Sequence, residues 1–187
     1  MQKPKNMGCI RLVNYNYSNI NYKISYIDLF DYDNEDQKKM VDKISQFYEK
    51  NNYCIAFIYN STYDKLFIPM MLIDKLGGYF CNEFYPTEPG FNFNDIYSLI
   101  KPTKKKPLIL VFENARELLV KIYNPKILNS NTKIAFQTIE DYYQFMDSIS
   151  TNIYPYVIVI MNSTASLENI NDHCALRYKN IFLDFKI

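Results

Sequence analysis

The sequence predicts an α/β protein in which a parallel sheet of about five strands lies between helices on both faces, a three-layer arrangement. Two observations lead to this prediction. Leu108–Phe112 and Tyr156–Met161 are apolar runs without polar alternation, a pattern typical of strands buried on both faces of a parallel sheet. From residue 53 onward, strand patterns alternate with helical ones, which favours helices packed against a central parallel sheet.

The first 34 residues are expected to form a small β extension ahead of the main domain, which spans residues 35–187. Apolar residues alternate loosely between Ile10 and Leu29, and the asparagine-rich stretch Asn14–Asn21 has the composition of a turn. We therefore expect a hairpin or a pair of edge strands in this region.

Residues 35–90 are expected to hold two helices and two strands. Gly77–Gly78 follows an apolar helical pattern and is typical of a helix end, because glycine adopts the left-handed conformation without steric cost. The expected elements are a helix over Glu35–Lys50, a strand over Tyr53–Tyr59, a polar turn over Asn60–Lys65, a helix over Leu66–Leu76, a strand over Tyr79–Tyr85 and a turn over Pro86–Gly90.

The second half of the main domain continues this alternation. Asn94 and Asp95 are expected to cap a short helix that reaches Ile100. The central strand Leu108–Phe112 ends abruptly in Glu113–Asn114, at the sheet edge where open α/β proteins bind ligands. The later elements expected are a helix over Arg116–Tyr123, a polar insertion over residues 124–137, a helix with a Thr138–Asp141 capping box ending at Ile149, a strand over Tyr156–Met161, a turn over Asn162–Ser166, a short helix through Leu176 and a strand over Asn180–Phe185.

Composition narrows the class of protein. The chain has 187 residues and a net charge of +1, so no overall field attracts it to nucleic acid or to a membrane. No apolar stretch approaches the roughly 20 residues of a membrane-spanning helix, and the N-terminus lacks the apolar core of a signal peptide. Of the four cysteines, Cys54 and Cys81 lie inside apolar runs, which favours buried reduced thiols. We expect a soluble, intracellular protein.

Three segments taken together resemble the large domain of AAA+ ATPases. The strand, P-loop and helix of that family are matched in shape by CIAFIYNSTYDKLFIPMMLIDKLGGYF, and its Walker B strand by KPLILVFENARELL. Its sensor-1 strand and the regions that follow are matched by YPYVIVIMNSTASLENINDHCALRYKNIFLDF. The resemblance covers residues 35–187 and is nearest to the mitochondrial inner-membrane AAA branch and the AAA-type ATPases of large DNA viruses. It implies a P-loop-like sheet, and the sequence has no counterpart of the family's C-terminal helical lid.

The nucleotide-binding positions that the resemblance implies are degenerate. A P-loop needs glycines because its backbone N–H groups must wrap closely around phosphates. Their places are taken here by Asn60, Ser61, Thr62, Tyr63 and Asp64, and Asp64 would set a negative charge against a triphosphate. Lys65 stands where the phosphate-binding lysine would be, but Leu66 replaces the hydroxyl residue that holds Mg²⁺.

The positions that would support hydrolysis are altered as well. Glu113 matches the metal-binding acid of the Walker B strand, whereas Asn114 replaces the glutamate that activates water, and an amide cannot accept the proton. Thr164 stands where the sensor asparagine usually lies, and Arg177 matches only the first arginine of the region that follows. We therefore assign no catalytic residue and no metal site.

These replacements predict a pseudo-ATPase without a cofactor, which serves as a structural or regulatory subunit of a larger protein assembly. The N-terminal hairpin and the insertion at 124–137 are its expected contact surfaces. One alternative is a divergent ATP-binding protein or ATPase that holds ATP and Mg²⁺ with Lys65 and Glu113. A weaker alternative is a nucleic-acid-binding module centred on Lys101–Lys106. That segment precedes the central strand, opposite the nucleotide edge, where a solvated loop is expected.

Overall fold

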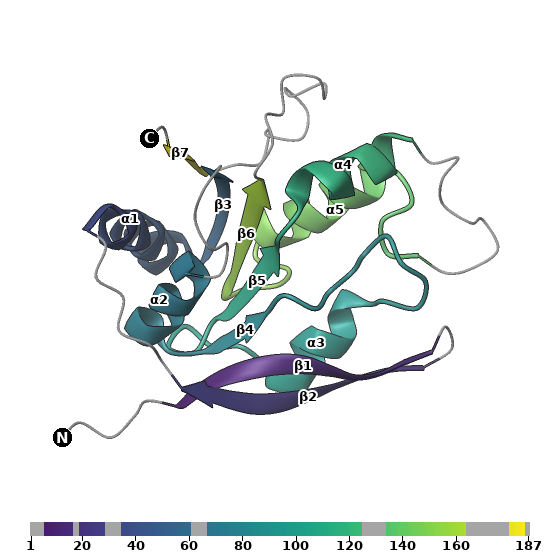
Figure 1. The fold of residues 1–187 in the computed structure, drawn as a ribbon, viewed down its shortest axis with the longest axis horizontal. Coiled ribbons are helices and arrows are strands. Elements are labelled where there is room, and N and C mark those ends of the chain that lie inside the picture. Colours follow the sequence, from purple (N-terminus) through teal and green to yellow (C-terminus); the bar gives the residue numbers. More distant parts are fainter. Residues whose placement is uncertain are drawn as a thin grey trace.

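A computed structural model of the chain describes residues 6–16, 19–28, 35–60, 67–124, 134–163 and 180–185. They form a seven-stranded sheet with helices on both faces (Figure 1), in the order β2-β1-β4-β5-β6-β3-β7. The strands are β1 (Asn6–Asn16), β2 (Asn19–Asp28), β3 (Tyr53–Asn60), β4 (Tyr79–Cys81), β5 (Leu108–Phe112), β6 (Val157–Ser163) and β7 (Ile181–Phe185). The α/β class and the parallel sheet are confirmed, and the arrangement is compatible with a P-loop-like fold.

The expected N-terminal strand pair is present, but it belongs to the main sheet. β1 pairs antiparallel with β2 along the hairpin and parallel with β4 through Gly8 and Cys9. Every other pairing in the sheet is parallel, so six strands share one direction, compared with the five or so expected. β2 is the single antiparallel strand and forms one edge of the sheet.

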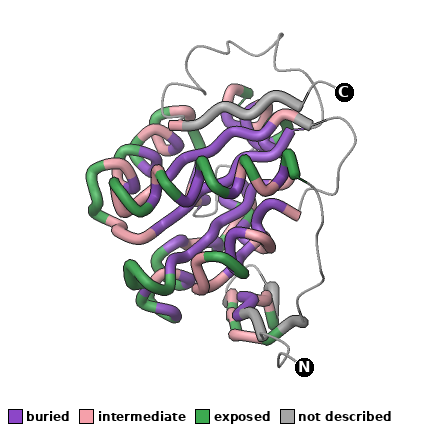
Figure 2. Tube along the Cα trace, turned by 90° about the vertical axis from the view of Figure 1, so that its left-hand side faces the viewer, coloured by how far each residue is buried: buried purple, intermediate pink, exposed green. Residues whose placement is uncertain are grey.

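The five helices of the described residues divide between the two faces of the sheet (Figure 1). They are α1 (Glu35–Asn51), α2 (Phe67–Leu76), α3 (Phe93–Ile100), α4 (Ala115–Tyr123) and α5 (Ile139–Ser150). In β5, Ile109 and Val111 belong to the apolar cluster under α1 and α2, whereas Leu108, Leu110 and Phe112 belong to the cluster under α3, α4 and α5. Every side chain of β5 and β6 is buried, as Figure 2 shows for the centre of the sheet.

Two strands end two or more residues away from the expected positions. The run from Tyr79 predicted a strand as far as Tyr85, but β4 stops at Cys81 because the chain then leaves the sheet and places Phe84 in an aromatic cluster. The rings around Phe84 are those of Phe91, Phe93, Phe112, Phe136 and Phe145. β6, in contrast, continues through Asn162 and Ser163, where a turn was expected, because both residues pair with β3 and are buried.

The helix boundaries follow their caps. α3 was expected to be capped by Asn94 or Asp95, but the cap is Asn92, whose side chain accepts a hydrogen bond from the Asn94 backbone N–H at 3.0 Å. The predicted capping box of Thr138 and Asp141 is present at the start of α5. Local hydrogen bonding therefore sets both starts.

The predicted stop after α2 is confirmed, and it requires glycine. Gly77 and Gly78 have φ angles of +74° and +98°, in the left-handed region. A Cβ at Gly78 would lie 2.2 Å from the Pro107 carbonyl oxygen, so the backbone there leaves no room for a side chain. The close approach brings β4 alongside the segment that leads into β5.

The insertion expected over residues 124–137 is only partly a surface segment. Ile134 and Phe136 are 8% and 2% exposed, so its end belongs to the core and cannot serve as a contact surface. Residues 125–133 and the helix expected through Leu176 lie outside the described residues. Within the ranges that the structure describes, no helix has the length and apolar character to cross a bilayer.

Candidate functional site

The carboxyl ends of β3, β6 and β5 lie side by side, in that order, at one edge of the sheet. Asn60 is the last residue of β3, Ser163 the last of β6, and Glu113 directly follows β5. Parallel strands bring their carboxyl ends to a common edge, which is where open α/β sheets bind ligands. The three segments that carry the AAA+ resemblance therefore meet at the edge where such a site would lie.

Three of the predicted site residues fall within the described part of the chain. These are Asn60, for which the structure describes the backbone, together with Glu113 and Asn114. The other predicted site residues lie outside the described residues: Ser61, Thr62, Asp64, Lys65, Thr164 and Arg177. The side chains that the structure describes at this edge therefore come mainly from the ends of β4 and β5 and from α4.

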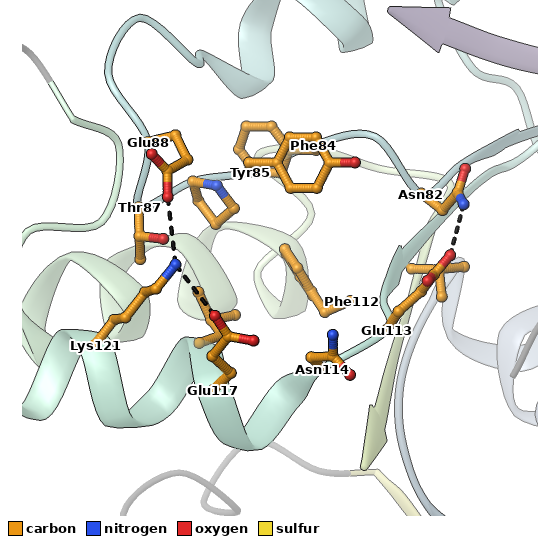
Figure 3. Close-up of a pocket in the computed structure, with 13 residues that line it drawn as sticks. Asn82, Phe84, Tyr85, Thr87, Glu88, Phe112, Glu113, Asn114, Glu117 and Lys121 are labelled. Atoms are coloured by element: carbon orange, nitrogen blue, oxygen red, sulfur yellow. Dashed lines mark hydrogen bonds and ion pairs between the residues drawn. The ribbon is translucent and has the colours of Figure 1, made fainter. Parts of the chain in front are cut away.

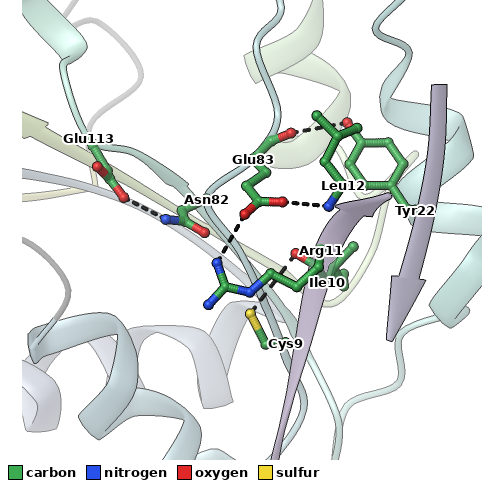
Figure 4. A network of polar contacts seen from close by, with 8 residues as sticks. All are labelled: Cys9, Ile10, Arg11, Leu12, Tyr22, Asn82, Glu83 and Glu113. Atoms are coloured by element: carbon green, nitrogen blue, oxygen red, sulfur yellow. Dashed lines mark hydrogen bonds and ion pairs between the residues drawn. The ribbon is translucent and has the colours of Figure 1, made fainter. Parts of the chain in front are cut away.

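Glu113 is held by a residue from the neighbouring strand. Its Oε1 accepts a hydrogen bond of 2.6 Å from Asn82 Nδ2, and Asn82 directly follows β4 (Figures 3 and 4). The Asn82 Oδ1 is buried and has no hydrogen-bond partner among the described residues. One carboxylate oxygen of Glu113 is thus already occupied by a neutral amide.

Asn114 is the N-cap residue of α4 and is exposed. Its side chain makes no capping hydrogen bond, although asparagine is a preferred residue at such a position. An amide carries no charge and cannot take a proton from an attacking water. The structure thus places a residue without acid–base capacity directly after Glu113.

A pocket of about 320 Å³ opens beside Glu113, between the loop after β4 and helix α4 (Figure 3). Phe84, Phe112 and Leu118 contribute apolar surface. Its charged residues are three glutamates and one lysine: Glu88, Glu113, Glu117 and Lys121. We call this site the acidic pocket. The charges of these four residues sum to −2, so they make the pocket negative.

Lys121 lies between two of these glutamates. Its Nζ is 3.3 Å from Glu88 Oε1 and 3.4 Å from Glu117 Oε1, on the opposite side of the pocket from Glu113 (Figure 3). Burial alone would lower the pKa of Lys121, but the hydrogen bonds to Glu88 and Glu117 outweigh it, and the pKa is raised. The only cation that the described residues contribute to the pocket is therefore already engaged in ion pairs.

A second polar network joins this edge to the N-terminal hairpin. Glu83, next to Asn82, accepts a hydrogen bond of 2.9 Å from Arg11 Nη1 and another from the Leu12 backbone N–H (Figure 4). The Tyr22 hydroxyl donates to the Glu83 carbonyl oxygen at 3.2 Å. The hydrogen bond that Arg11 donates to Glu83 raises the pKa of Arg11. We call Glu83 and these three partners the hairpin clamp.

Sequence reasoning missed Asn82, Glu83 and Lys121. A signal was available for the first two, because a polar pair directly follows the apolar run Tyr79–Cys81, just as Glu113–Asn114 follows Leu108–Phe112. Extending the strand to Tyr85 concealed that parallel. Lys121 follows Glu117 by four residues on α4, the spacing of a helical ion pair, but nothing in its pattern indicates Glu88 as a second partner.

The described cysteines do not add nucleophiles or ligands to this edge. Cys9, Cys54 and Cys81 are buried and free, as expected for the last two. Burial raises the pKa of Cys54 and of Cys81 to about 12, so both stay protonated thiols at neutral pH. Within the described ranges, no group of three or more His, Cys, Asp or Glu residues could hold a metal ion.

The described part of the edge does not fit a nucleoside triphosphate. Phosphate groups carry the same sign of charge as Glu88, Glu113 and Glu117, and Lys121 is the only cation among the described residues that line the pocket. These carboxylates would repel a phosphate group in the pocket, most strongly where water is partly excluded. The chemistry of these residues favours a cationic group over an anionic one.

Comparison with known proteins assigns no family to this geometry. No protein-family model matches the sequence, and no curated protein matches it. The function is therefore argued from the fold and from the edge that it forms.

Proposed function

We propose that the chain is a degenerate AAA+-like domain that does not hydrolyse ATP and serves as a structural or regulatory subunit of a larger protein assembly. The observation that carries the proposal is the chemistry at the end of β5. Glu113 is bonded to Asn82, Asn114 follows it, and the adjoining pocket is acidic. An ATPase needs a base and an excess of cations at this place.

The residues after β5 lack the groups that hydrolysis requires. Asn114 cannot act as a general base, and Glu113 already shares an oxygen with Asn82. If Glu113 instead took the role of the base, the edge would lose its only candidate for the metal-binding acid of the Walker B strand. One carboxylate cannot fill both positions.

The retained sheet and its apolar core support a structural role. β5 and β6 are completely buried, and α1 to α5 cover both faces of the sheet. A sheet of this kind keeps its shape without a ligand, because burial of apolar surface is the main source of its stability. The resemblance to AAA+ domains, which pack side by side, supports a role in which that shape is used for assembly.

Equilibrium binding of ATP, with and without Mg²⁺, tests the first half of the proposal by calorimetry. We expect no binding at millimolar ATP and no phosphate release. A micromolar dissociation constant that is lost in Lys65→Ala and in Glu113→Gln would overturn the proposal in favour of a divergent ATP-binding protein. Lys75→Ala is the matched control, because it removes an exposed lysine of α2 and should leave any binding unchanged.

Association of the purified chain tests the second half. Size-exclusion chromatography and capture experiments should show an oligomer or a protein partner. A monomer that captures no partner would contradict the structural role, whatever the result with ATP.

A further inference from the structure

Strand β5 carries opposite charges at its two ends. The segment Lys101–Lys106 leads into the strand at its amino end, and Glu113 follows at its carboxyl end, beside the acidic pocket. We call the lysine-rich segment the basic turn. β5 has five residues, so the two charged sites are separated by roughly 17 Å of strand, at about 3.3 Å per residue.

The basic turn is built as a fixed structure. Thr103 and Lys106 exchange two backbone hydrogen bonds, of 3.1 and 2.9 Å, across the turn. The Tyr48 hydroxyl of α1 donates to the Lys104 carbonyl oxygen at 3.0 Å. Lys101 closes α3 in the left-handed conformation, with its N–H bonded to the Tyr97 carbonyl oxygen at 2.9 Å. The backbone that presents the lysines therefore needs little ordering when a partner binds.

The charges of the basic turn are uncompensated. Its lysines are all exposed, and none forms an ion pair with a described residue; they are Lys101, Lys104, Lys105 and Lys106. The net charge of the whole chain is only +1, so this excess is balanced by acids elsewhere. The acidic pocket holds part of that balance, at the far end of the same strand.

The acidic pocket suits a lysine side chain. Glu113 has no cationic partner among the described residues, and Glu117, an exposed carboxylate on the opposite wall, shares the single cation Lys121 with Glu88. Apolar surface from Phe84 and Phe112 lies between these acids and can cover the methylene stem of a lysine, while the ammonium reaches a carboxylate.

We infer that the acidic pocket of one copy receives the basic turn of a second copy, so that copies of the chain associate head to tail along β5. A second copy satisfies both surfaces at once. A nucleic acid would use the basic turn alone, and an unrelated basic protein would use the pocket alone. Charge complementarity within one chain therefore favours the chain itself as the partner.

This contact joins two different surfaces, so the assembly grows as an open chain unless the geometry closes a ring. The contact is polar and exposed, so its strength should depend on salt. The inference rests on the proposed structural role and names its partner. Its test measures association only, so failure here leaves the result with ATP unaffected.

Sedimentation velocity on the full chain provides the first measurement. We expect association at low salt that is lost at about 1 M salt, where the Debye length falls to about 3 Å. A monomer at low salt, at concentrations where a weak contact would form, overturns the inference. A monomer that instead binds a single-stranded oligonucleotide through the basic turn overturns it in favour of nucleic acid.

Charge reversal provides the sharper measurement. The first variant carries Lys104→Glu, Lys105→Glu and Lys106→Glu, and the second carries Glu88→Lys and Glu117→Lys. Each alone should associate at least about tenfold more weakly than the wild type, because like charges then face each other. An equimolar mixture should associate again, since each pocket then meets a turn of opposite charge. Recovery in the mixture also shows that both variants are folded.

A matched control keeps the change in net charge and moves it elsewhere. Lys23→Glu, Lys39→Glu and Lys43→Glu alter three exposed lysines of β2 and α1, away from both surfaces. This control should associate as the wild type does. Association by either reversed variant alone, or a mixture that stays monomeric, overturns the inference.

Discussion

The central strands and the N-terminal hairpin belong to one sheet but differ in how much of their surface is buried. Every side chain of β5 and β6 is buried, whereas Val13 and Tyr26 of the hairpin are 46% and 66% exposed. The hairpin meets β4 in a short ladder and is fixed by the hairpin clamp around Glu83. The hairpin buries Cys9 and Ile10 in the core, but among the described side chains it contributes fewer buried apolar ones than β5 or β6 and adds the polar contacts of the clamp. We therefore expect the hairpin to open while the rest of the sheet stays intact.

The largest effect should follow from a change in the centre of the sheet. Leu110 is fully buried in β5, between the helices of one face and the neighbouring strands. Leu110→Ala removes apolar contacts and leaves a cavity, which should lower the free energy of unfolding by about 2–5 kcal/mol. Chemical denaturation followed by circular dichroism measures this loss for the whole domain.

Leu99→Ala is the matched control, because Leu99 lies on α3 with 41% of its surface exposed. The same truncation there should change stability by no more than about 0.5 kcal/mol. Equal effects at the two positions would mean that β5 is not the centre of the core.

A smaller and local effect should follow from the hairpin clamp. Glu83→Gln keeps the size of the side chain but removes the charge that holds Arg11 and the Leu12 N–H. Both partners are partly exposed, so we expect a loss of about 1–2 kcal/mol, less than for a buried charge pair. Hydrogen exchange should become faster in β1 and β2, with β5 and β6 unchanged.

Glu88→Gln provides the comparison for that experiment. Glu88 lies in the same connection between β4 and α3, and its side chain is more exposed, at 44%, than that of Glu83, at 21%. Its loss should leave exchange in the hairpin unaffected. If Glu83→Gln also accelerated exchange in β5, the hairpin and the core would open as one unit, and the distinction between them would be wrong.

The difference between the two regions also explains how much the sequence predicts. The apolar runs, the glycines after α2 and the capping box of α5 act over a few neighbouring residues, and each was predicted correctly. The same local rules correctly predicted that β3, β5 and β7 are strands. The burial of an apolar run can be predicted without knowing its packing partner, because any apolar neighbour removes it from water.

The polar contacts could not be predicted in this way. Glu83 is 72 positions from Arg11 in the sequence, and Asn82 is 31 positions from Glu113. The periodicity of apolar residues predicts which face of a strand a side chain occupies. It does not predict which strand lies next to it in the sheet. The order β1-β4-β5 decides both contacts. For the same reason, Glu113 was correctly placed at the carboxyl edge, while its partner Asn82 was assigned to the interior of a strand.

The smallest effect on stability should come from an ion pair that lies outside the core and does not join the hairpin to the sheet. Lys75 Nζ lies 2.6 Å from Asp42 Oδ1, between α2 and α1, with side chains 40% and 55% exposed. Lys75→Ala should lower the free energy of unfolding by only about 0.2–1 kcal/mol, because water screens both charges and the pair must order two flexible side chains. The difference should vanish at high salt. Lys43→Ala is the control, since Lys43 is exposed on α1 without an ion pair to a described residue. If Lys75→Ala instead lowered the free energy of unfolding as much as Glu83→Gln does, short polar contacts would stabilise this protein wherever they occur. The effect of the clamp would then come from its charge and not from its place between the hairpin and the sheet.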